Sequence, residues 1–226
     1  MEGTKRKPII EFKDFQFHYF SQAEPTLYDI NLTIYEGEKV LIVGPSGSGK
    51  STLGNCLNGL IPFAYKGEIQ GSLKINGKET RDMNIFQLSK MVGTVLQDSD
   101  GQFIGLTVGE DIAFALENDC VGQKEMKETV ERVAKMVDMD QLLSSSPFEL
   151  SGGQKQRVAF AGVMVDDVDI LLFDEPLANL DPATGKTAID LIDQVWKNYN
   201  KTVIIVEHRL EDVLYLLCNH ILLKIA

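Results

Sequence analysis

Two glycine-rich stretches of this chain have the composition of phosphate-binding loops. Residues 44–52 read GPSGSGKST and match the pattern G-x-x-x-x-G-K-[ST], in which glycines let successive backbone N–H groups turn toward an anion. Residues 150–157 read LSGGQKQR, and a serine with two glycines at a predicted helix start exposes amides in the same way. The sequence therefore predicts two phosphate-binding helix starts, and it raises the question of which phosphate the second one binds.

The first loop offers a cation and a hydroxyl in addition to its amides. Lys50 is expected to lie near the γ-phosphate of a nucleotide, and Ser51 to coordinate Mg²⁺ through its hydroxyl. The loop lies between the apolar run KVLIVG and a predicted helix, which is the context in which this motif binds nucleotides. The predicted ATP-binding residues of the loop are Gly44, Pro45, Ser46, Gly47, Ser48, Gly49, Lys50, Ser51 and Thr52.

Two carboxylates follow a second apolar run, DILLFDEP. Asp174 and Glu175 are expected at the carboxyl end of a buried strand, where ligands bind in sheets of this kind. Asp174 is expected to hold Mg²⁺ through a water molecule, and Glu175 to accept a proton from an attacking water. The alternative is that the pair only caps the following loop, but the phosphate loop earlier in the chain favours the catalytic interpretation.

Three further side chains fit the same site. Gln97 ends the strand-like run MVGTVLQ and is expected to reach Mg²⁺ and the attacking water, while His208 ends TVIIVEH and is expected to contact the γ-phosphate. Tyr19, in FQFHY, is able to stack on a purine. A histidine at a strand end and an aromatic in a strand are more often structural, and His18 and His220 are interpreted that way.

The elements that position these residues alternate between strands and helices. Two strands within residues 9–20 and 27–38 alternate apolar and polar residues and are expected to pair antiparallel. Short apolar runs predict buried strands that alternate with helices, and hence a mostly parallel sheet covered on both faces. From about residue 106 to 150 apolar residues recur at helical spacing with almost no strand signal, which predicts an inserted helical subdomain.

Bulk composition excludes several classes of protein. The chain has 226 residues, of which 44% are hydrophobic and 24% charged, and this composition is typical of a globular protein rather than a disordered one. The net charge of −11 argues against a nucleic-acid partner. No apolar run approaches the roughly 20 residues that cross a bilayer, and no apolar segment of a signal peptide follows MEGTKRKP. The cysteines Cys56, Cys120 and Cys218 lack metal-ligand spacing and are expected to be reduced.

In this order the motifs resemble those of ATP-binding-cassette (ABC) ATPases, over essentially the whole chain. The resemblance implies an α/β P-loop NTPase fold with a mostly parallel sheet, an antiparallel N-terminal β subdomain and the helical insert. It implies one domain over residues 1–226, with 1–105 and 151–226 as the core. It matches Tyr19 to the adenine-stacking aromatic, Gly44–Thr52 to Walker A, Gln97 to the Q-loop, Leu150–Gln154 to the signature, Asp174 and Glu175 to Walker B and the general base, Leu180 and Asp181 to the D-loop, and His208 to the switch histidine.

The resemblance also implies an answer for the second loop. In this family two cassettes meet head to tail, and the signature of one completes the nucleotide site of the other. Ser151, Gly152, Gly153 and Gln154 are then expected to contact an ATP held by a second cassette. That second cassette is expected as an identical chain, a related chain, or another part of a longer polypeptide. Hydrolysis, with Mg²⁺ as cofactor, is expected to let the halves separate.

The residues after Gln97 narrow the resemblance. DSDGQFIGLTVGEDIAFALEN and EPLANLDPATG are similar to the ATPase subunits of energy-coupling-factor (ECF) transporters, which include the cobalt and nickel importers. The resemblance implies uptake of a vitamin or metal ion, with a transmembrane coupling subunit and a substrate-binding membrane subunit as partners. The chain is then expected in the cytoplasm, held peripherally on the inner face of the cell membrane. Because ECF ATPases usually continue beyond a point corresponding to HILLKIA, the sequence is expected to be truncated at its C-terminus.

Other functions remain open at this point. ABC ATPases of other importer classes share the main motifs, and non-transport ABC ATPases act in DNA repair or translation. The latter carry long or basic inserts, which this chain lacks. A small-molecule P-loop kinase would explain Lys50 but leave the LSGGQ stretch without a role. A non-hydrolytic ATP-binding regulator is disfavoured by the presence of both Glu175 and His208.

Overall fold

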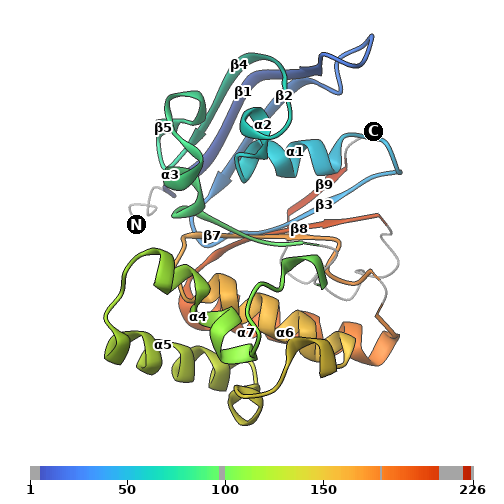
Figure 1. The fold of residues 1–226 in the computed structure, drawn as a ribbon. Helices are drawn as coiled ribbons and strands as arrows, with labels where there is room; N and C mark the ends of the chain where they lie inside the picture. The colour runs from blue at the N-terminus through green and yellow to red at the C-terminus, as the bar shows by residue number, and fades with distance from the viewer. Residues whose placement is uncertain (1–5, 97–99, 179, 209–220, 225–226) are drawn as a thin grey trace, which may run out of the picture.

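The computed structural model describes residues 6–96, 100–178, 180–208 and 221–224. The described strands form one antiparallel and one parallel sheet. In Figure 1 the antiparallel sheet lies at the top, the parallel sheet crosses the middle, and the longer helices lie below it. This layering buries apolar residues on both faces of the parallel sheet.

The antiparallel sheet is built mainly from the N-terminal part of the chain. Its strand order is β2-β1-β4-β5, and β1 pairs with both β2 and β4. The predicted antiparallel pairing of the first two strands is therefore confirmed. The strands are β1 (Pro8–Tyr19), β2 (Leu27–Tyr35), β4 (Gly67–Ile75) and β5 (Lys78–Glu79).

The parallel sheet has the order β6-β7-β8-β3-β9, and every neighbouring pair runs parallel. All residues of β3 and β8 are buried, because layers of the protein cover both faces of this sheet. Parallel pairing brings the carboxyl ends of the strands to one edge. The strands are β3 (Lys39–Val43), β6 (Val92–Val95), β7 (Ile170–Asp174), β8 (Thr202–Glu207) and β9 (Ile221–Lys224).

Helices cover the two faces of the parallel sheet unequally. In Figure 1, α1 lies between the two sheets, and α4, α5, α6 and α7 lie on the other side of the parallel sheet. The α-helices are α1 (Lys50–Leu57), α2 (Leu60–Phe63), α3 (Ile85–Ser89), α4 (Val108–Asn118), α5 (Gln123–Met136), α6 (Gly152–Met164) and α7 (Pro182–Tyr199). The 3₁₀ turns are η1 (Thr80–Asp82), η2 (Asp100–Gln102), η3 (Asp140–Leu142) and η4 (Pro147–Glu149).

The stretch STLGNCLNGL, residues 51–60, predicts one helix after the phosphate loop, and the helix observed there is shorter. Helix α1 ends at Leu57, and α2 begins at Leu60. Between them Gly59 adopts a φ of 83°, a left-handed conformation that glycine adopts without a Cβ clash and that ends a helix. The helix that the sequence predicts over 209–217 lies outside the described residues.

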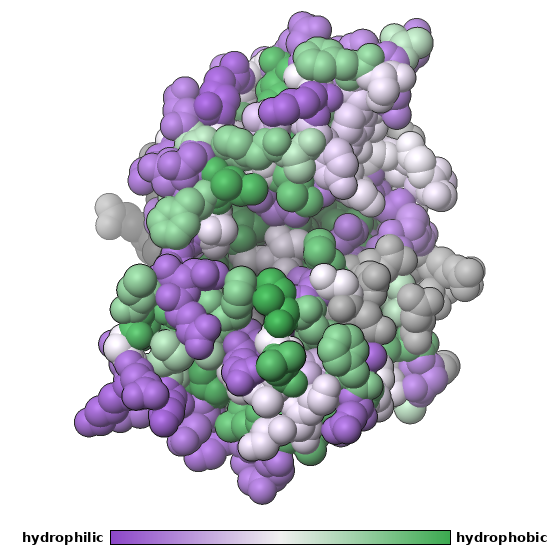
Figure 2. All heavy atoms as spheres, in the orientation of Figure 1, coloured by the Kyte–Doolittle hydropathy of each residue, from purple (hydrophilic) through white to green (hydrophobic). Residues whose placement is uncertain are grey.

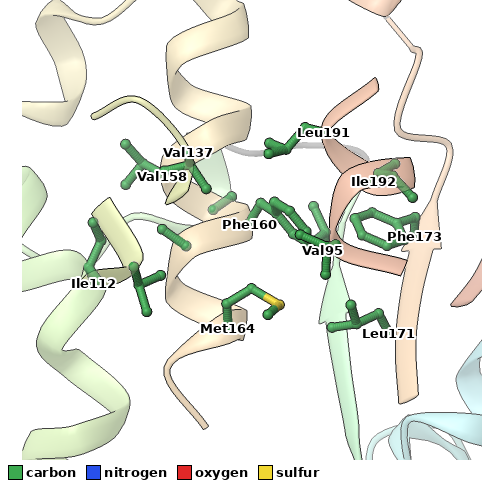
Figure 3. Packing of buried hydrophobic residues seen from close by; sticks show 14 of the residues in the cluster. Val95, Ile112, Val137, Val158, Phe160, Met164, Leu171, Phe173, Leu191 and Ile192 are labelled. Carbon is green, nitrogen blue, oxygen red and sulfur yellow. The ribbon is translucent and has the colours of Figure 1, made fainter. Parts of the chain in front are cut away.

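Helix α6 is the central packing element on the lower side of the sheet. Figure 3 shows Phe160 directed toward Phe173 of the sheet, while Val158 lies toward Val137 on the other side of the helix. The rings of Phe160 and Phe173 have centroids 5.4 Å apart. Helix α6 contacts β6, α4, α5 and α7, so its position is determined by several elements at once.

Residues 106–150 are all described and form α4, α5, η3 and η4. We call residues 106–150 the helical segment. It is tied to α6 by Arg157, whose Nη1 donates to the Val137 carbonyl and to Asp138 Oδ2, both at 2.8 Å. Within the part of the chain that the structure covers, no helix is long and apolar enough to cross a membrane.

Two glycines make a matched test of this packing. A Cβ added at Gly93 of β6 would lie 2.2 Å from Val163 Cγ1 of α6, whereas a Cβ at Gly162 of α6 would meet nothing within 4 Å. We expect Gly93→Ala to lower the free energy of unfolding by about 1–3 kcal/mol through overpacking. We expect Gly162→Ala to raise it by roughly 0.5–1 kcal/mol, because alanine loses less backbone entropy in a helix. Urea unfolding of both variants measures this, and equal effects of the two would contradict the packing described.

Candidate functional site

The carboxyl edge of the parallel sheet brings the predicted site residues together. In the sheet register Asp174 lies opposite Val206, and Val43 lies opposite Glu207. The loop 44–49 follows β3, Glu175 follows β7, and His208 follows β8, and these three strands are neighbours in the order β7-β8-β3. The loop, Glu175 and His208, which the sequence assigned to one nucleotide site, therefore come from adjacent strand ends.

Lys50 is held inside the loop that precedes α1. Its side-chain Nζ donates to the Gly44 carbonyl at 2.8 Å and to the Pro45 carbonyl at 2.9 Å, and only 3% of the residue is exposed. Gly49, the residue before the helix, has a φ of 92°, and a Cβ there would lie 2.9 Å from Leu27 Cδ2. The loop thus surrounds a buried ammonium group, which adds a positive charge next to the loop amides.

Glu175 is buried and has an unusual backbone conformation. It is 7% exposed, and its φ of 51° lies in the left-handed region, which a non-glycine residue without a short polar side chain seldom adopts. Its N–H donates to the Val206 carbonyl at 2.9 Å, and its carboxylate Oε1 contacts Nε2 of His208. The predicted general base and the predicted switch histidine are therefore in direct contact.

Asp174 carries a polar atom without a partner. Its Oδ1 is buried and makes no hydrogen bond within the part of the chain that the structure describes. Burial raises the pKa of this carboxyl group, and the neighbouring Glu175 charge raises it further, while His208 and Lys50 act in the opposite direction. A bound cation would stabilise the ionised form of such a buried carboxylate, which has an oxygen without a hydrogen-bond partner.

The residues at this edge suit Mg²⁺, because they offer few oxygen donors and Mg²⁺ does not need a full set of protein ligands. The candidate donors are the buried Oδ1 of Asp174 and the hydroxyl of Ser51, an exposed residue in the first turn of α1. Both are oxygen donors, which suit a hard cation, and Mg²⁺ typically takes its other ligands from water and phosphate. Among the described residues no group of three His, Cys, Asp or Glu side chains is arranged to hold a metal. Gln97, the third predicted ligand, lies outside the described residues.

Tyr19 lies beside the start of α1. Its hydroxyl is 3.2 Å from Thr52 Oγ1, and its ring packs edge-on against Phe17 with centroids 4.6 Å apart. The side chain is partly exposed, as is that of Tyr65, whose ring centroid lies 6.5 Å away. The structure thus places this aromatic residue next to the phosphate loop, where stacking on a base remains a proposal.

The second phosphate loop begins α6 with a capping box. Ser151 Oγ accepts from the Gln154 N–H at 3.4 Å, and Gln154 Oε1 accepts from the Ser151 N–H at 2.9 Å. In the described structure the amides of Gly152 and Gly153 have no hydrogen-bond acceptor. These two N–H groups are therefore the ones available to an anion, while the Gln154 side chain closes the cap.

Asp181 caps the neighbouring helix α7. Its Oδ1 accepts from the N–H groups of Ala183 at 3.0 Å and Thr184 at 3.2 Å. The hydrogen bond from the Thr184 hydroxyl lowers the pKa of Asp181, and the backbone bonds act in the same direction. A Cβ at Gly153 would lie 2.6 Å from Thr184 Cγ2, so a glycine there lets the starts of α6 and α7 approach closely.

The two phosphate loops lie on opposite sides of the parallel sheet. Helix α1 contacts β7 and β8 on the side of the antiparallel sheet, whereas α6 lies on the other side (Figure 1). Sequence reasoning gave no role to Gln156, Arg157 or Glu207, although the first two lie inside the LSGGQKQR stretch and the third precedes His208. Their position next to assigned motif residues is the only signal that pointed to them.

Comparisons with known proteins agree on one family. A model of the ABC transporter family matches residues 27–178. A protein of Clostridium perfringens, provisionally named an ABC transporter ATP-binding protein, is 70% identical over 210 residues, which are 93% of this chain and 37% of that protein. A similarly named protein of Photobacterium profundum is 68% identical over 206 residues, or 91% of this chain and 36% of that protein. The chain thus spans little more than a third of these curated relatives.

A solved structure shows the same fold. It is that of cbiO1 from Clostridium perfringens, described as part of the ABC transporter complex cbiONQ. The match has a TM-score of 0.83 and 31% sequence identity, and it covers 92% of this chain and 81% of the other. The α/β fold class expected from the sequence is confirmed by this match.

The buried Asp174 carboxylate leads to a stability prediction. Without nucleotide or metal, Asp174→Asn is expected to raise the melting temperature at pH 7, because it removes a charge that burial disfavours. The folded-state pKa lies above the ordinary value of 3.8, so the wild-type protein takes up a proton as the pH falls through that raised pKa, and the difference between the two proteins should then shrink. Thermal unfolding between pH 4 and 7 measures this. Asp190→Asn, at an exposed position, is the control, and a lower melting temperature for Asp174→Asn at pH 7 would refute the argument.

Proposed function

The chain belongs to the ABC transporter family of ATP-binding proteins, and from that premise we propose that it hydrolyses ATP as one half of a nucleotide-sandwich dimer. The observation that carries the proposal is the placement of two phosphate-binding helix starts on opposite sides of one sheet. One of them lies beside two carboxylates and a histidine. The other has two available amides at the start of α6.

In the proposed mechanism the loop 44–52 binds the phosphates of ATP. Its amides and the Lys50 ammonium neutralise charge on the β- and γ-phosphates, and Tyr19 stacks on the adenine. Ser51 and Asp174 hold Mg²⁺, with Asp174 acting through a water molecule. The metal, when bound, supplies further charge neutralisation between the phosphates.

Glu175 is the proposed general base. Its buried carboxylate takes the proton from the attacking water. His208 contacts Oε1 of this carboxylate and thereby orients the carboxylate. Gln97 helps to position the water. The catalytic set proposed from this chain is thus Glu175, His208 and Gln97, and each acts on the nucleotide bound to the same chain.

The signature residues act on a different nucleotide. The Gly152 and Gly153 amides, at the positive end of α6, contact the γ-phosphate of the ATP held by a second cassette, and Ser151 adds its hydroxyl. Asp181 and the start of α7 lie next to this contact and face the second cassette as well. The dimer closes when ATP fills both pockets and opens when hydrolysis removes the shared contacts.

The second cassette is either another copy of this chain, a relative, or a further part of a longer polypeptide. The curated relatives support the last possibility, because this chain matches 37% of the C. perfringens protein and leaves room for another cassette. All three arrangements produce the same composite site. They differ only in whether both sites contain the same residues.

We further propose that the ATPase drives an ECF-type importer of a vitamin or metal ion. The similarity to cbiO1, part of the cbiONQ complex, supports this class, together with the sequence of residues 98–118. The proposed partners are a transmembrane coupling subunit and a substrate-binding membrane subunit. The chain then lies peripherally on the inner face of the cell membrane.

An exposed apolar surface is the proposed docking site for the coupling subunit. Figure 2 shows hydrophobic residues gathered on both sides of a hollow that lies between α3 and the start of α4. Exposed apolar residues occur in the segments that border it, and Leu106 is 80% exposed; they are Ile85 and Phe86 of α3, Leu96 directly after β6, and Ile104 and Leu106 shortly before α4. A short amphipathic helix of a membrane protein would bury this surface.

The central test uses Glu175→Gln in the full-length protein. We expect ATP turnover to fall by roughly 10²–10³, because the amide is unable to accept the proton from water. We also expect the variant to form a stable dimer, or a closed tandem, only with Mg-ATP. Phosphate release and small-angle scattering or light scattering measure the two effects. Adding Ser151→Ala should weaken the ATP-driven closure, and closure that ignores both ATP and Ser151 would refute the sandwich.

The docking surface has its own test. Leu106→Asp is expected to reduce binding of the full-length ATPase to membranes that contain its transport subunits by at least about tenfold, while basal ATPase activity stays unchanged. Tyr28→Asp, on the exposed side of β2 and 65% exposed, is the matched control. Co-sedimentation with membranes measures binding. Equal losses for both variants would show that the surface is not specific.

A further inference from the structure

One peptide group next to the proposed general base is held from both sides. The carbonyl of Pro176 accepts a hydrogen bond from Nε2 of Gln156, which lies on α6. The N–H of Leu177, which belongs to the same peptide group, donates to Oε1 of Glu207 at 3.1 Å. Glu207 ends β8 and is only 5% exposed. Two side chains from distant parts of the sequence thus clamp a single peptide.

The clamp fixes the orientation of the backbone directly after Glu175. In a trans peptide the C=O and the N–H point in opposite directions, so holding both prevents the group from rotating. The neighbouring turn is closed by the Ala178 N–H, which donates to the Glu175 carbonyl at 3.0 Å. A left-handed residue such as Glu175 needs this kind of support from its surroundings.

The same clamp connects the two phosphate loops of one chain. Gln156 lies about one helical turn after Gly152 and Gly153, whose amides face outward at the start of α6. Its neighbour Arg157 ties that helix to the end of α5. Gln156 therefore provides a direct side-chain link between α6 and the peptide at Pro176.

We propose that Gln156 and Glu207 are positioning residues that set the place of the Glu175 carboxylate and link it to the signature loop of the same chain. This inference rests on the proposed function, because it assigns the signature loop to one nucleotide and Glu175 to the other. In a closed dimer, ATP bound against Gly152 and Gly153 holds α6, and α6 in turn holds the general base of the other site. The occupancy of one pocket thereby controls turnover in its neighbour.

The test separates this role from a general structural one. Gln156→Met keeps the length of the side chain but has no donor for the Pro176 carbonyl. In the full-length protein we expect kcat to fall about tenfold or more, with the KM for ATP within about twofold of wild type, because only the placement of the general base is disturbed. In a Glu175→Gln background, Gln156→Met should leave Mg-ATP-driven closure unchanged.

Two further variants make the experiment specific. Glu207→Gln keeps an oxygen acceptor for the Leu177 N–H and should retain clearly more activity than Glu207→Met, which lacks one. Gln141→Met is the control for the substitution itself, since Gln141 is exposed and bonds only to Asp140 in the described structure. Melting temperatures of all variants establish that they are folded.

Several outcomes would overturn the inference. Unchanged kcat in Gln156→Met would remove the positioning role, and loss of ATP-driven closure would show that Gln156 shapes the signature loop instead. Failure of both Gln156→Met and Glu207→Met to fold would make the clamp structural. If Glu175→Gln itself does not close with Mg-ATP, the proposed sandwich fails, which is a separate result from failure of the clamp.

Discussion

At the carboxyl edge of the parallel sheet, a buried ammonium group and a buried carboxylate lack full charge compensation, and the proposed site depends on this constraint. Lys50 is almost fully buried, and its ammonium is bonded to two carbonyl oxygens of its own loop, while Asp174 has a buried oxygen with no partner among the described residues. Dipoles stabilise an ammonium less than a full negative charge does, and a desolvated carboxylate without a cation is unfavourable. A phosphate chain with a hard cation satisfies both needs at once. The strand order that places β7, β8 and β3 side by side is what keeps these charges close together.

Helix α6 connects the parallel sheet to the helical segment. One side of the helix packs on the sheet through Phe160, the other meets the helical segment, and Arg157 adds two hydrogen bonds to the end of α5. A helix held on several sides moves as a unit with its neighbours rather than bending locally. Two amides of its first turn have no acceptor in the described structure, so a phosphate bound there, as proposed, would act on the helix and its neighbours together. The helical segment is thereby connected to the parallel sheet through the packing of α6 as well as through the sequence.

Much of the fold is visible in the sequence because the signals are local. KVLIVG and TVIIVE are continuous apolar runs, as strands buried on both faces must be, and GPSGSGKST contains the glycines that its turn requires. The break between α1 and α2 was missed, since it depends on a left-handed Gly59 inside an otherwise helical pattern. The clamp on Pro176 was also invisible, because Gln156 and Glu207 meet only through the tertiary fold. Sequence spacing predicts which strand end a residue occupies, but not which peptide its side chain holds.

Several unfavourable local features of the described chain fall on residues proposed to do chemistry. Glu175 combines burial with a left-handed backbone, Asp174 combines burial with an unbonded oxygen, and the amides of Gly152 and Gly153 point away from any acceptor in the described structure. Burial of an unbonded carboxylate oxygen and a left-handed non-glycine backbone both cost stability, so their presence needs a different reason. The proposed binding of a nucleotide and Mg²⁺ at the pocket of this chain would explain the features of Glu175 and Asp174. The glycine amides lie on the opposite side of the sheet from that pocket, and the proposed second cassette would bring a phosphate to them.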